Sequence, residues 1–202
     1  MTLWRGDQPL ILASQSASRQ MLLRNAGIPF EAIPAAVDER AVQEKSGLEA
    51  PQEIAGLLAR EKALEVARRK PGRLVIGADQ TLALGPRLFN KPAGRNPAAL
   101  QLRALAGQTH ALYSAVAVAR DGEVLFADVA VARLAMRALS DADISAYLDA
   151  AGARVTTSVG AYQLEGLGIH LFERIDGDHF TILGLPLLPL LGFLRRQGLL
   201  AF

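Results

Sequence analysis

Acidic residues follow two extended, apolar segments of this 202-residue chain, where they could bind a metal ion. Asp79 comes directly after the apolar run 74–78, and Asp38 and Glu39 close the segment 30–37. A carboxylate beside an apolar strand is costly unless it is solvated, capped or bound to a cation. Two carboxylates from separate strand ends suit Mg²⁺, which also takes oxygen ligands from substrate phosphates. For Asp79, the functional and structural interpretations are about even, and taken singly each acidic site is better explained as a solvated turn.

Serines and an arginine lie where the first apolar run passes into a helix. Ser14, Ser16 and Ser18 are followed at once by Arg19. Hydroxyl groups, free backbone N–H groups and the helix dipole at such a position favour an anion such as phosphate. Ordinary N-capping by the serines explains the same residues, and from these residues alone it is the better interpretation.

Two lysines and a glutamate complete the candidate set. Lys62 lies one turn beyond Leu58, at the edge of the apolar side of a long predicted helix, and Lys91 lies in a constrained loop. Either lysine could complement phosphate charge, and either could be an ordinary surface residue. Glu165, in a glycine-flanked loop, leaves the same two alternatives open. The whole set indicates a metal–phosphate site.

Alternating strand-like and helix-like segments position these residues. Apolar and alternating runs predict strands over 10–13, 30–37, 74–78, 111–119, 124–136 and 171–175. Helix start and stop signals predict helices over 19–25, 51–70, 96–107, 140–150 and 185–196. Asp121-Gly122 predicts a hairpin turn. The order predicts an α/β fold with a mixed, twisted sheet and helices on both faces.

Composition excludes several classes of protein. The chain has no cysteine and only three histidines, which argues against a disulfide scaffold, a thiol nucleophile and a His-rich metal cage. We interpret one of these histidines, His110, as structural. A net charge of +2 without a basic run argues against a nucleic-acid polymer as partner. Hydrophobic residues make up 50% of the chain, too many for a disordered protein.

Targeting and familiar enzyme motifs are missing from the sequence. The first ten residues lack an apolar signal segment, and the most apolar stretch, 184–194, is interrupted by prolines and too short to span a membrane. We therefore expect a cytoplasmic protein that forms one domain over residues 1–202. The sequence contains no GxxxxGK[ST] loop, GxGxxG turn, HExxH or GxSxG motif, which argues against P-loop kinases, Rossmann dehydrogenases, zincins and α/β-hydrolases.

A set of short motifs follows in order between about residues 10 and 196. They are Leu12-Ala13-Ser14-Gln15-Ser16 with Arg19, Val37-Asp38-Glu39, Ala59-Arg60-Glu61-Lys62-Ala63, Ile76-Gly77-Ala78-Asp79, Lys91-Pro92, Leu105-Ala106-Gly107 with His110, Gly160-Ala161-Tyr162, Glu165-Gly166 and Gly184-Leu185-Pro186. No single motif is specific, but the ordered set resembles the Maf family of nucleotide pyrophosphatases.

The resemblance implies a fold, a reaction and a role for each candidate residue. The fold would have two lobes around a deep cleft without a separable linker, as in inosine-triphosphatase-like enzymes, often in a homodimer. The reaction would be hydrolysis of a nucleoside triphosphate to the monophosphate and pyrophosphate, with Mg²⁺ or Mn²⁺. Asp79 would activate water and bind the metal together with Glu39. The remaining implied roles are triphosphate binding by Ser14, Arg19, Lys62 and Lys91, and a position near the nucleotide for Glu165.

Departures from the commonest family pattern bear on the substrate. Ala17 and Ser18 stand where the family usually has Pro-Arg, so one phosphate-facing cation is missing. Gln80, Glu165 and the segment Leu171-Phe172-Glu173-Arg174 resemble the subgroup that acts on 7-methyl-GTP. A carboxylate suits this base, because N7-methylguanine is positively charged and offers N–H donors.

Two other functions stay open from the sequence. The family is linked to septum formation, so the chain could instead be a nucleotide-binding regulator of cell division that acts through a protein partner. A phosphatase that releases inorganic phosphate is a third hypothesis. The presence of both acidic sites and both lysines favours the pyrophosphatase.

Overall fold

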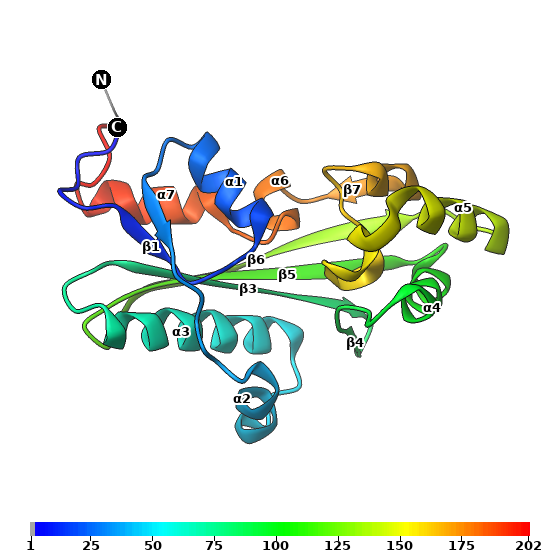
Figure 1. The fold of residues 1–202 in the computed structure, drawn as a ribbon, viewed down its shortest axis with the longest axis horizontal. Helices are drawn as coiled ribbons and strands as arrows, with labels where there is room; N and C mark the ends of the chain where they lie inside the picture. The colour runs from blue at the N-terminus through cyan, green and yellow to red at the C-terminus, as the bar shows by residue number, and fades with distance from the viewer. Residues whose placement is uncertain (1–2) are drawn as a thin grey trace. The chain divides into compact units, whose positions relative to one another are not determined.

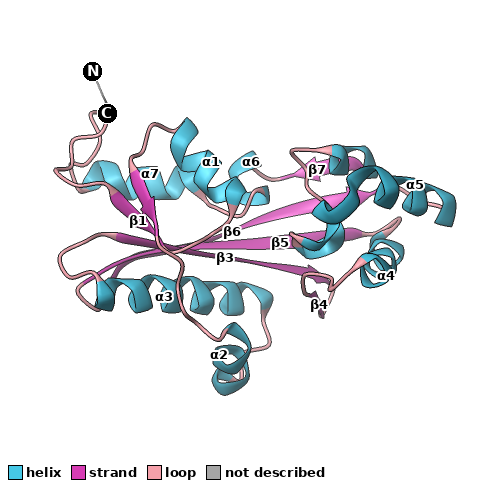
Figure 2. Ribbon diagram, viewed as in Figure 1, coloured by secondary structure: helices cyan, strands magenta, loops and turns pink. Residues whose placement is uncertain are grey.

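One mixed sheet organises residues 3–202, the part of the chain that the computed structural model describes (Figures 1 and 2). Its strand order is β2-β1-β3-β5-β6-β7, and β4 pairs with β3. β1 is parallel to β2 and β3, whereas β4 is antiparallel to β3 and β7 is antiparallel to β6. This mixed α/β architecture confirms the predicted fold class.

The elements follow one another in the order β1-α1-β2-α2-α3-β3-β4-α4-β5-β6-α5-β7-α6-α7, with short 3₁₀ helices between α5 and β7. The strands are β1 (Leu10–Leu12), β2 (Phe30–Ala32), β3 (Val75–Leu84), β4 (Arg87–Phe89), β5 (Thr109–Arg120), β6 (Glu123–Met136) and β7 (Phe172–Asp176). The helices are α1 (Ala17–Asn25), α2 (Glu39–Ser46), α3 (Pro51–Arg69), α4 (Arg95–Leu105), α5 (Asp141–Ala151), α6 (His179–Ile182) and α7 (Leu187–Arg196), and the 3₁₀ helices are η1 (Gly152–Thr156), η2 (Val159–Ala161) and η3 (Leu167–Leu171).

The chain divides into two compact units. The first comprises the residues up to Gln80, Ser114–Ala130 and Leu183–Phe202, and the second comprises Thr81–Tyr113 and Val131–Ile182. Strands β3, β5 and β6 contribute residues to both units. The prediction of one domain with a cleft between two lobes stays a prediction.

In the first unit, α3 lies along one face of the sheet and α1 and α7 lie along the other (Figure 1). The buried side of α3 is formed largely by small residues at four-residue spacing, Ala55, Ala59, Ala63 and Ala67. Ile54 and Leu58 are also buried on this side, whereas Leu57 and Leu64 are only half-buried. The alanines let the helix approach the sheet closely.

Gly77 of β3 is the point of closest approach. A Cβ atom at this position would lie 2.1 Å from the carbonyl oxygen of Ala59 and 2.6 Å from the backbone nitrogen of Ala63. Any side chain at this position would therefore collide with the backbone of α3. Because alternate residues of a strand point to the same face, Asp79 also faces α3.

The second unit has its own hydrophobic core, which includes Leu82, Leu102, Leu134 and Met136. His110 belongs to it: the side chain is 1% exposed, and Nε2 lies 2.7 Å from the Tyr162 hydroxyl oxygen. Burial lowers the pKa of His110 to about 4, so the ring is neutral at pH 7. These contacts confirm that His110 is structural.

The boundaries of two predicted strands were wrong, and one helix was not predicted. β2 ends at Ala32 instead of residue 37, and a helix that we did not predict, α2, begins at Glu39. The side chain of Asp38 accepts a hydrogen bond from Ala41 N at 3.0 Å, so this residue caps α2 instead of ending a strand. β3 continues through Asp79 to Leu84, because residues 82–84 pair with β4.

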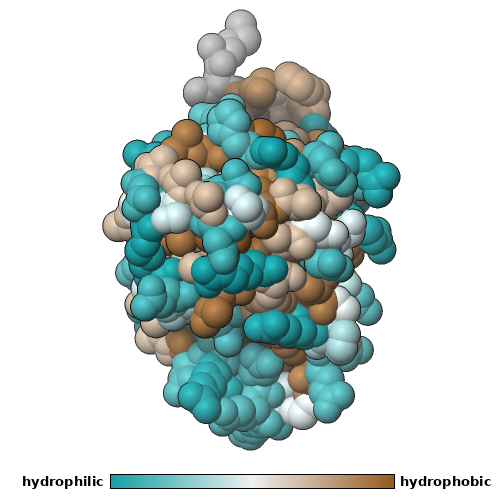
Figure 3. All heavy atoms as spheres, turned by 90° about the vertical axis from the view of Figure 1, so that its right-hand side faces the viewer, coloured by the Kyte–Doolittle hydropathy of each residue, from teal (hydrophilic) through white to brown (hydrophobic). Residues whose placement is uncertain are grey.

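Few large apolar side chains are exposed on the second unit. Leu100, Leu167 and Ile169 are the large exposed apolar residues of the second unit, and hydrophobic and hydrophilic residues intermix on the face drawn in Figure 3. Such scattered apolar residues are normal on a protein surface. Among residues 3–202, no helix is both long enough and apolar enough to cross a membrane.

Gly77→Ala tests the close approach of α3 to the sheet. The added methyl group has no room against the backbone of α3, so we expect a loss of about 1–3 kcal/mol in the free energy of unfolding, as for other overpacked cores. Urea unfolding measures this loss. Gly56→Ala is the matched control, because a Cβ there would make only an ordinary contact, 3.5 Å from Val129 Cγ2. Equal stability of the two variants would contradict the close approach.

Candidate active site

A lysine ammonium group joins two carboxylates in the first unit. Lys62 Nζ lies 2.6 Å from Asp79 Oδ1 and 2.7 Å from Glu39 Oε1. The side chains of Lys62 and Asp79 are only 12% and 9% exposed, whereas that of Glu39 is 54% exposed. The two acidic residues singled out in the sequence therefore meet at one cation.

Three elements bring these side chains together. Lys62 projects from α3 next to Ala59 and Ala63, where the helix lies against Gly77 of β3. Asp79 is two residues further along β3 and faces the same helix. Glu39 is the first residue of α2, and the capping of that helix by Asp38 fixes where its first turn begins.

The prediction that Asp79 ends a strand was wrong, because the residue lies inside β3. A carboxylate at such a position must be paired if it is ionised. Lys62 supplies the partner at hydrogen-bond distance, which lets the strand continue past the acidic residue. Of the three alternatives left open for this carboxylate, solvation, capping and a bound cation, the structure shows a cation, which is a side chain of the same unit.

Arg19 of α1 is fixed by backbone carbonyl groups. Its Nε donates to Gly184 O at 2.8 Å, and its Nη1 donates to Ala78 O at 2.8 Å and to Ser14 Oγ at 3.2 Å. These bonds join three separate parts of the first unit. They use Nε and Nη1 and leave the two N–H groups of Nη2 as additional donors.

The charge of Arg19 is coupled to the two carboxylates. Burial lowers the pKa of its guanidinium group from the ordinary value, and the negative charges of Asp79 and Glu39 oppose that shift. An arginine stays protonated in proteins, so the group is a cation. The site thus combines two cationic and two anionic side chains within one unit.

The serines next to Arg19 have separate roles. Ser16 is the N-cap of α1, where its side chain accepts from Arg19 N at 3.4 Å, as the capping interpretation predicted. Ser14 Oγ accepts from Ser16 N and from Arg19 Nη1, both at 3.2 Å. Ser14 therefore orients the arginine side chain that follows it.

Lys91 and Glu165 belong to the second unit, and both are exposed. Lys91 lies between β4 and α4, and Glu165 lies between η2 and η3. Their contribution to a nucleotide site stays a prediction.

Several groups of the site gave no signal in the sequence. The carbonyl oxygens of Ala78 and Gly184 bind Arg19, and backbone atoms carry no residue-type signature. Gln80 Nε2 donates to Ser114 Oγ at 2.9 Å, and Ser114 is fully buried in β5. A serine inside an apolar strand pattern could be noticed as unusual, but nothing in the sequence links it to Gln80.

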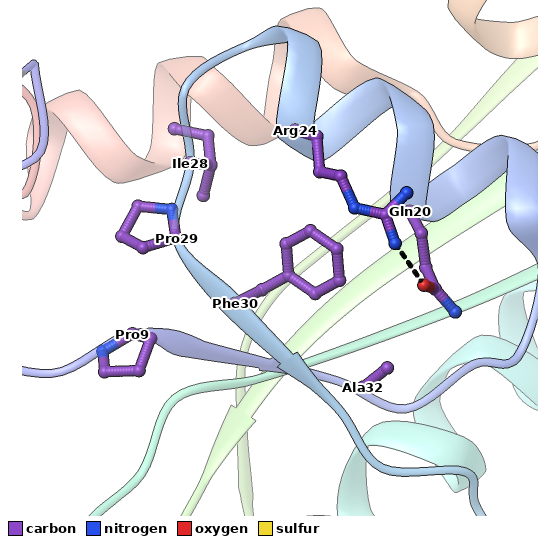
Figure 4. Close-up of a pocket in the computed structure, with 7 residues that line it drawn as sticks. All are labelled: Pro9, Gln20, Arg24, Ile28, Pro29, Phe30 and Ala32. Carbon is purple, nitrogen blue, oxygen red and sulfur yellow. Dashed lines mark hydrogen bonds between the residues drawn. The ribbon is translucent and has the colours of Figure 1, made fainter.

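A surface pocket of about 480 Å³ lies elsewhere in the first unit. Figure 4 shows its lining, with Phe30 facing Arg24, whose guanidinium carbon lies 5.6 Å from the ring centroid. Arg24 Nη2 also donates to Gln20 Oε1 at 2.7 Å. Pro9 and Ile28 line the pocket as well, but none of the predicted site residues does.

The donor set fits a magnesium-like cation that shares its coordination with phosphate. Asp79 and Glu39 both direct an oxygen at one ammonium nitrogen, so both face a single cation position. Within residues 3–202, no cluster of three or more His, Asp or Glu side chains could hold a metal on its own. One or two carboxylates completed by substrate phosphates is the usual arrangement for Mg²⁺.

Comparison with known proteins gives this site its family context. The model for the Maf-like protein family matches residues 9–197. The chain belongs to the Maf-like family. A nucleoside triphosphate pyrophosphatase of Rhodopseudomonas palustris (strain ATCC BAA-98 / CGA009) is 69% identical over 201 residues, which cover 100% of both chains.

Other relatives are more distant. A 7-methyl-GTP pyrophosphatase of Rhizobium etli is 55% identical over 192 residues, or 94% of this chain and 96% of the relative. A solved structure, a HAM1 protein from Coxiella burnetii, matches 63% of this chain and 72% of its own at 14% identity and a TM-score of 0.40. At this TM-score, the likeness carries no conclusion about this Maf-like protein.

Arg19→Lys tests the backbone anchoring of the arginine in this Maf-like protein. A lysine cannot make the same set of fixed bonds to Gly184 O and Ala78 O, so we expect a loss of about 1–3 kcal/mol in the free energy of unfolding. Chemical denaturation measures it. Arg24→Lys on the same helix is the control, since Arg24 is exposed and bonds only to Gln20. A loss that is no larger than in the control would contradict the anchoring role.

Proposed function

We propose that this chain hydrolyses nucleoside triphosphates to the monophosphate and pyrophosphate, with a divalent cation bound by Asp79 and Glu39. The observation that carries the proposal is the meeting of these two carboxylates at one cation position, with Arg19 fixed nearby. Membership of the Maf-like family and close relatives named as nucleoside triphosphate pyrophosphatases support it. These names favour the enzyme over a regulator of cell division.

Asp79 is the proposed base. Its carboxylate is nearly buried and faces the proposed cation position, where it can accept a proton from a water molecule. The water oxygen forms a bond to the α-phosphorus as the bond to the α–β bridging oxygen breaks. Pyrophosphate leaves, and the proton from the water passes to Asp79.

The bound cation would offset phosphate charge and make its coordinated water easier to deprotonate. Asp79 and Glu39 would hold it from opposite elements, β3 and α2. Either Mg²⁺ or Mn²⁺ matches two carboxylate oxygens and phosphate ligands.

The cationic side chains are the proposed ligands of the triphosphate. Arg19 offers the two N–H groups of Nη2, while its other nitrogens fix its position. Lys62 adds a second positive charge from α3, and Ser14 orients Arg19. Lys91 of the second unit is the further phosphate ligand that the family resemblance implies.

The base preference we propose is 7-methyl-GTP or a related guanine nucleotide. Glu165 and Gln80 support it on the family pattern, as does the Rhizobium etli relative named 7-methyl-GTP pyrophosphatase. The more similar relatives carry the broader name of nucleoside triphosphate pyrophosphatase. The homodimer, the cytoplasmic location and the absence of a nucleic-acid partner are further proposals that rest on the resemblance and on composition.

A product assay tests the reaction. Purified protein with Mg²⁺ or Mn²⁺ is incubated with dTTP, UTP, CTP, GTP and 7-methyl-GTP, and pyrophosphate and inorganic phosphate are detected separately. Pyrophosphate release from one or a few of these substrates is the expected result. Release of inorganic phosphate would indicate a phosphatase, and nucleotide binding without turnover would favour the regulator.

Asp79→Asn tests the proposed base. We expect turnover to fall by about 10²–10⁴-fold, the usual contribution of general base catalysis, because an amide cannot accept the proton from water. The rate of pyrophosphate release measures it, with circular dichroism to check the fold. Asp7→Asn, at an exposed position, is the control and should keep wild-type activity. Near-normal turnover in the Asp79 variant would remove Asp79 from the mechanism.

Glu165→Gln tests the proposed contact with the base. The change removes the carboxylate charge that favours N7-methylguanine, so kcat/KM for 7-methyl-GTP should fall relative to that for GTP. Competition between the two substrates measures this ratio directly. Glu123→Gln, an exposed change in the first unit, should leave the ratio as it is. An unchanged substrate ranking in the Glu165 variant would overturn the assignment.

A further inference from the structure

Lys62 occupies the place that a shared metal ion would take. Its nitrogen lies 2.6 Å and 2.7 Å from one oxygen of Asp79 and one of Glu39. Mg²⁺ binds carboxylate oxygens at roughly 2.0–2.1 Å. An ion bound to both oxygens would lie within about the same small volume as the ammonium group, so the two cannot be bound there together.

The charges of the site explain why Asp79 and Glu39 need a cation beside them both with and without a bound metal ion. Asp79 and Glu39 carry −2 and Arg19 and Lys62 carry +2, so the four side chains are balanced. A divalent cation in place of the ammonium group keeps the carboxylates neutralised and makes the charge of Lys62 available. The same four side chains with the cation would carry +2, which suits a polyanionic triphosphate.

We propose that Lys62 is an internal counter-ion that yields its place to a divalent cation and then binds a phosphate group of the nucleotide. This inference rests on the proposed function and deepens it. It makes metal binding and nucleotide binding mutually favourable, because the ammonium group released by the cation finds a new partner in the phosphate.

The two cationic side chains of the site are suited to different tasks. Arg19 is held by two backbone carbonyl oxygens and Ser14, so it cannot move without breaking three hydrogen bonds. Lys62 bonds only to the two carboxylates and has a flexible four-carbon stem. Lys62 can therefore change partner within the site while α3 stays in place.

Binding of Mn²⁺ without nucleotide is the first test. Lys62→Met and Lys62→Gln remove the competing charge, so both should bind Mn²⁺ at least about fivefold more tightly than the wild type, the lower end of typical coupling between ligands. Titration calorimetry and Mn²⁺ electron paramagnetic resonance measure the Kd. Asp79→Asn should weaken binding, and Lys70→Met, which changes an exposed lysine at the C-terminal end of α3, should leave it unchanged.

Thermal unfolding separates this role from a purely structural one. Without metal, both Lys62 variants should have a lower Tm, because Asp79 and Glu39 face each other without a cation, and saturating Mn²⁺ should raise their Tm more than that of the wild type. A purely structural lysine would lower the Tm without any gain in Mn²⁺ affinity.

The coupling to nucleotide is tested with the α,β-methylene analogue of GTP, which cannot be cleaved at the α–β position. In the wild type, this analogue should tighten Mn²⁺ binding, and in Lys62→Met the effect should shrink by at least about fivefold. If the analogue tightened Mn²⁺ binding equally in both proteins, the proposed transfer of the Lys62 ammonium group to phosphate would be wrong.

The wild-type protein provides a measurement that no folding defect can affect. The ammonium resonance of Lys62 should shift when Mg²⁺ is added in the absence of nucleotide, whereas that of Lys70 should not. Each of three results would overturn the proposal. These are a Lys62 resonance that does not shift at saturating Mg²⁺, a Mn²⁺ affinity that is unchanged in both Lys62 variants, and Mn²⁺ binding that Asp79→Asn does not weaken. Pyrophosphate release by the wild type is measured separately, so the proposed reaction can stand where the displacement of Lys62 fails.

Discussion

A carboxylate in the middle of a buried strand needs a partner, and the pairing of Asp79 with Lys62 answers that need. Breaking a buried ion pair by removing one partner costs roughly 3–5 kcal/mol, because the other charge is left without compensation. The pairing holds only if α3 lies close to β3. Gly77 and the alanine row of α3 provide this closeness, so the smallest side chains of the first unit determine where its most important charges meet.

A second constraint fixes the backbone of β3 next to Asp79. Arg19 reaches from α1 to the carbonyl oxygens of Ala78 and Gly184 and thereby connects three distant parts of the chain. Asp79 is the residue after Ala78, so two neighbouring residues of the strand are held, Asp79 through its side chain by Lys62 and Ala78 through its carbonyl oxygen by Arg19. Both contacts hold the strand at the point where the proposed chemistry takes place.

The core of the second unit contains neutral polar side chains instead of an ion pair. Its core contains His110 and Tyr162, whose polar atoms contact each other at 2.7 Å within apolar surroundings. Burial lowers the pKa of His110 and raises that of Tyr162, so both stay neutral and serve packing instead of catalysis. The exposed Lys91 and Glu165 lie on connecting segments of this unit. Charged side chains on loops can vary without disturbing the core.

The mixed α/β class, most of the strands and helices, and the family could be predicted from the residues alone, because apolar periodicity and ordered local motifs are properties of the chain. The sequence also identified Asp79, Glu39, Lys62 and Arg19 as a set of charges. The prediction missed α2, whose N-cap Asp38 we had placed at the end of a strand. It also missed the continuation of β3 past Asp79, since pairing with β4 and with Lys62 outweighs the local signal for a strand end. Only the tertiary structure decided that Lys62 lies between the two carboxylates and that backbone carbonyl oxygens hold Arg19. The physical reason is that these contacts join residues far apart in the chain, and their energy depends on burial and distance, which no local pattern encodes.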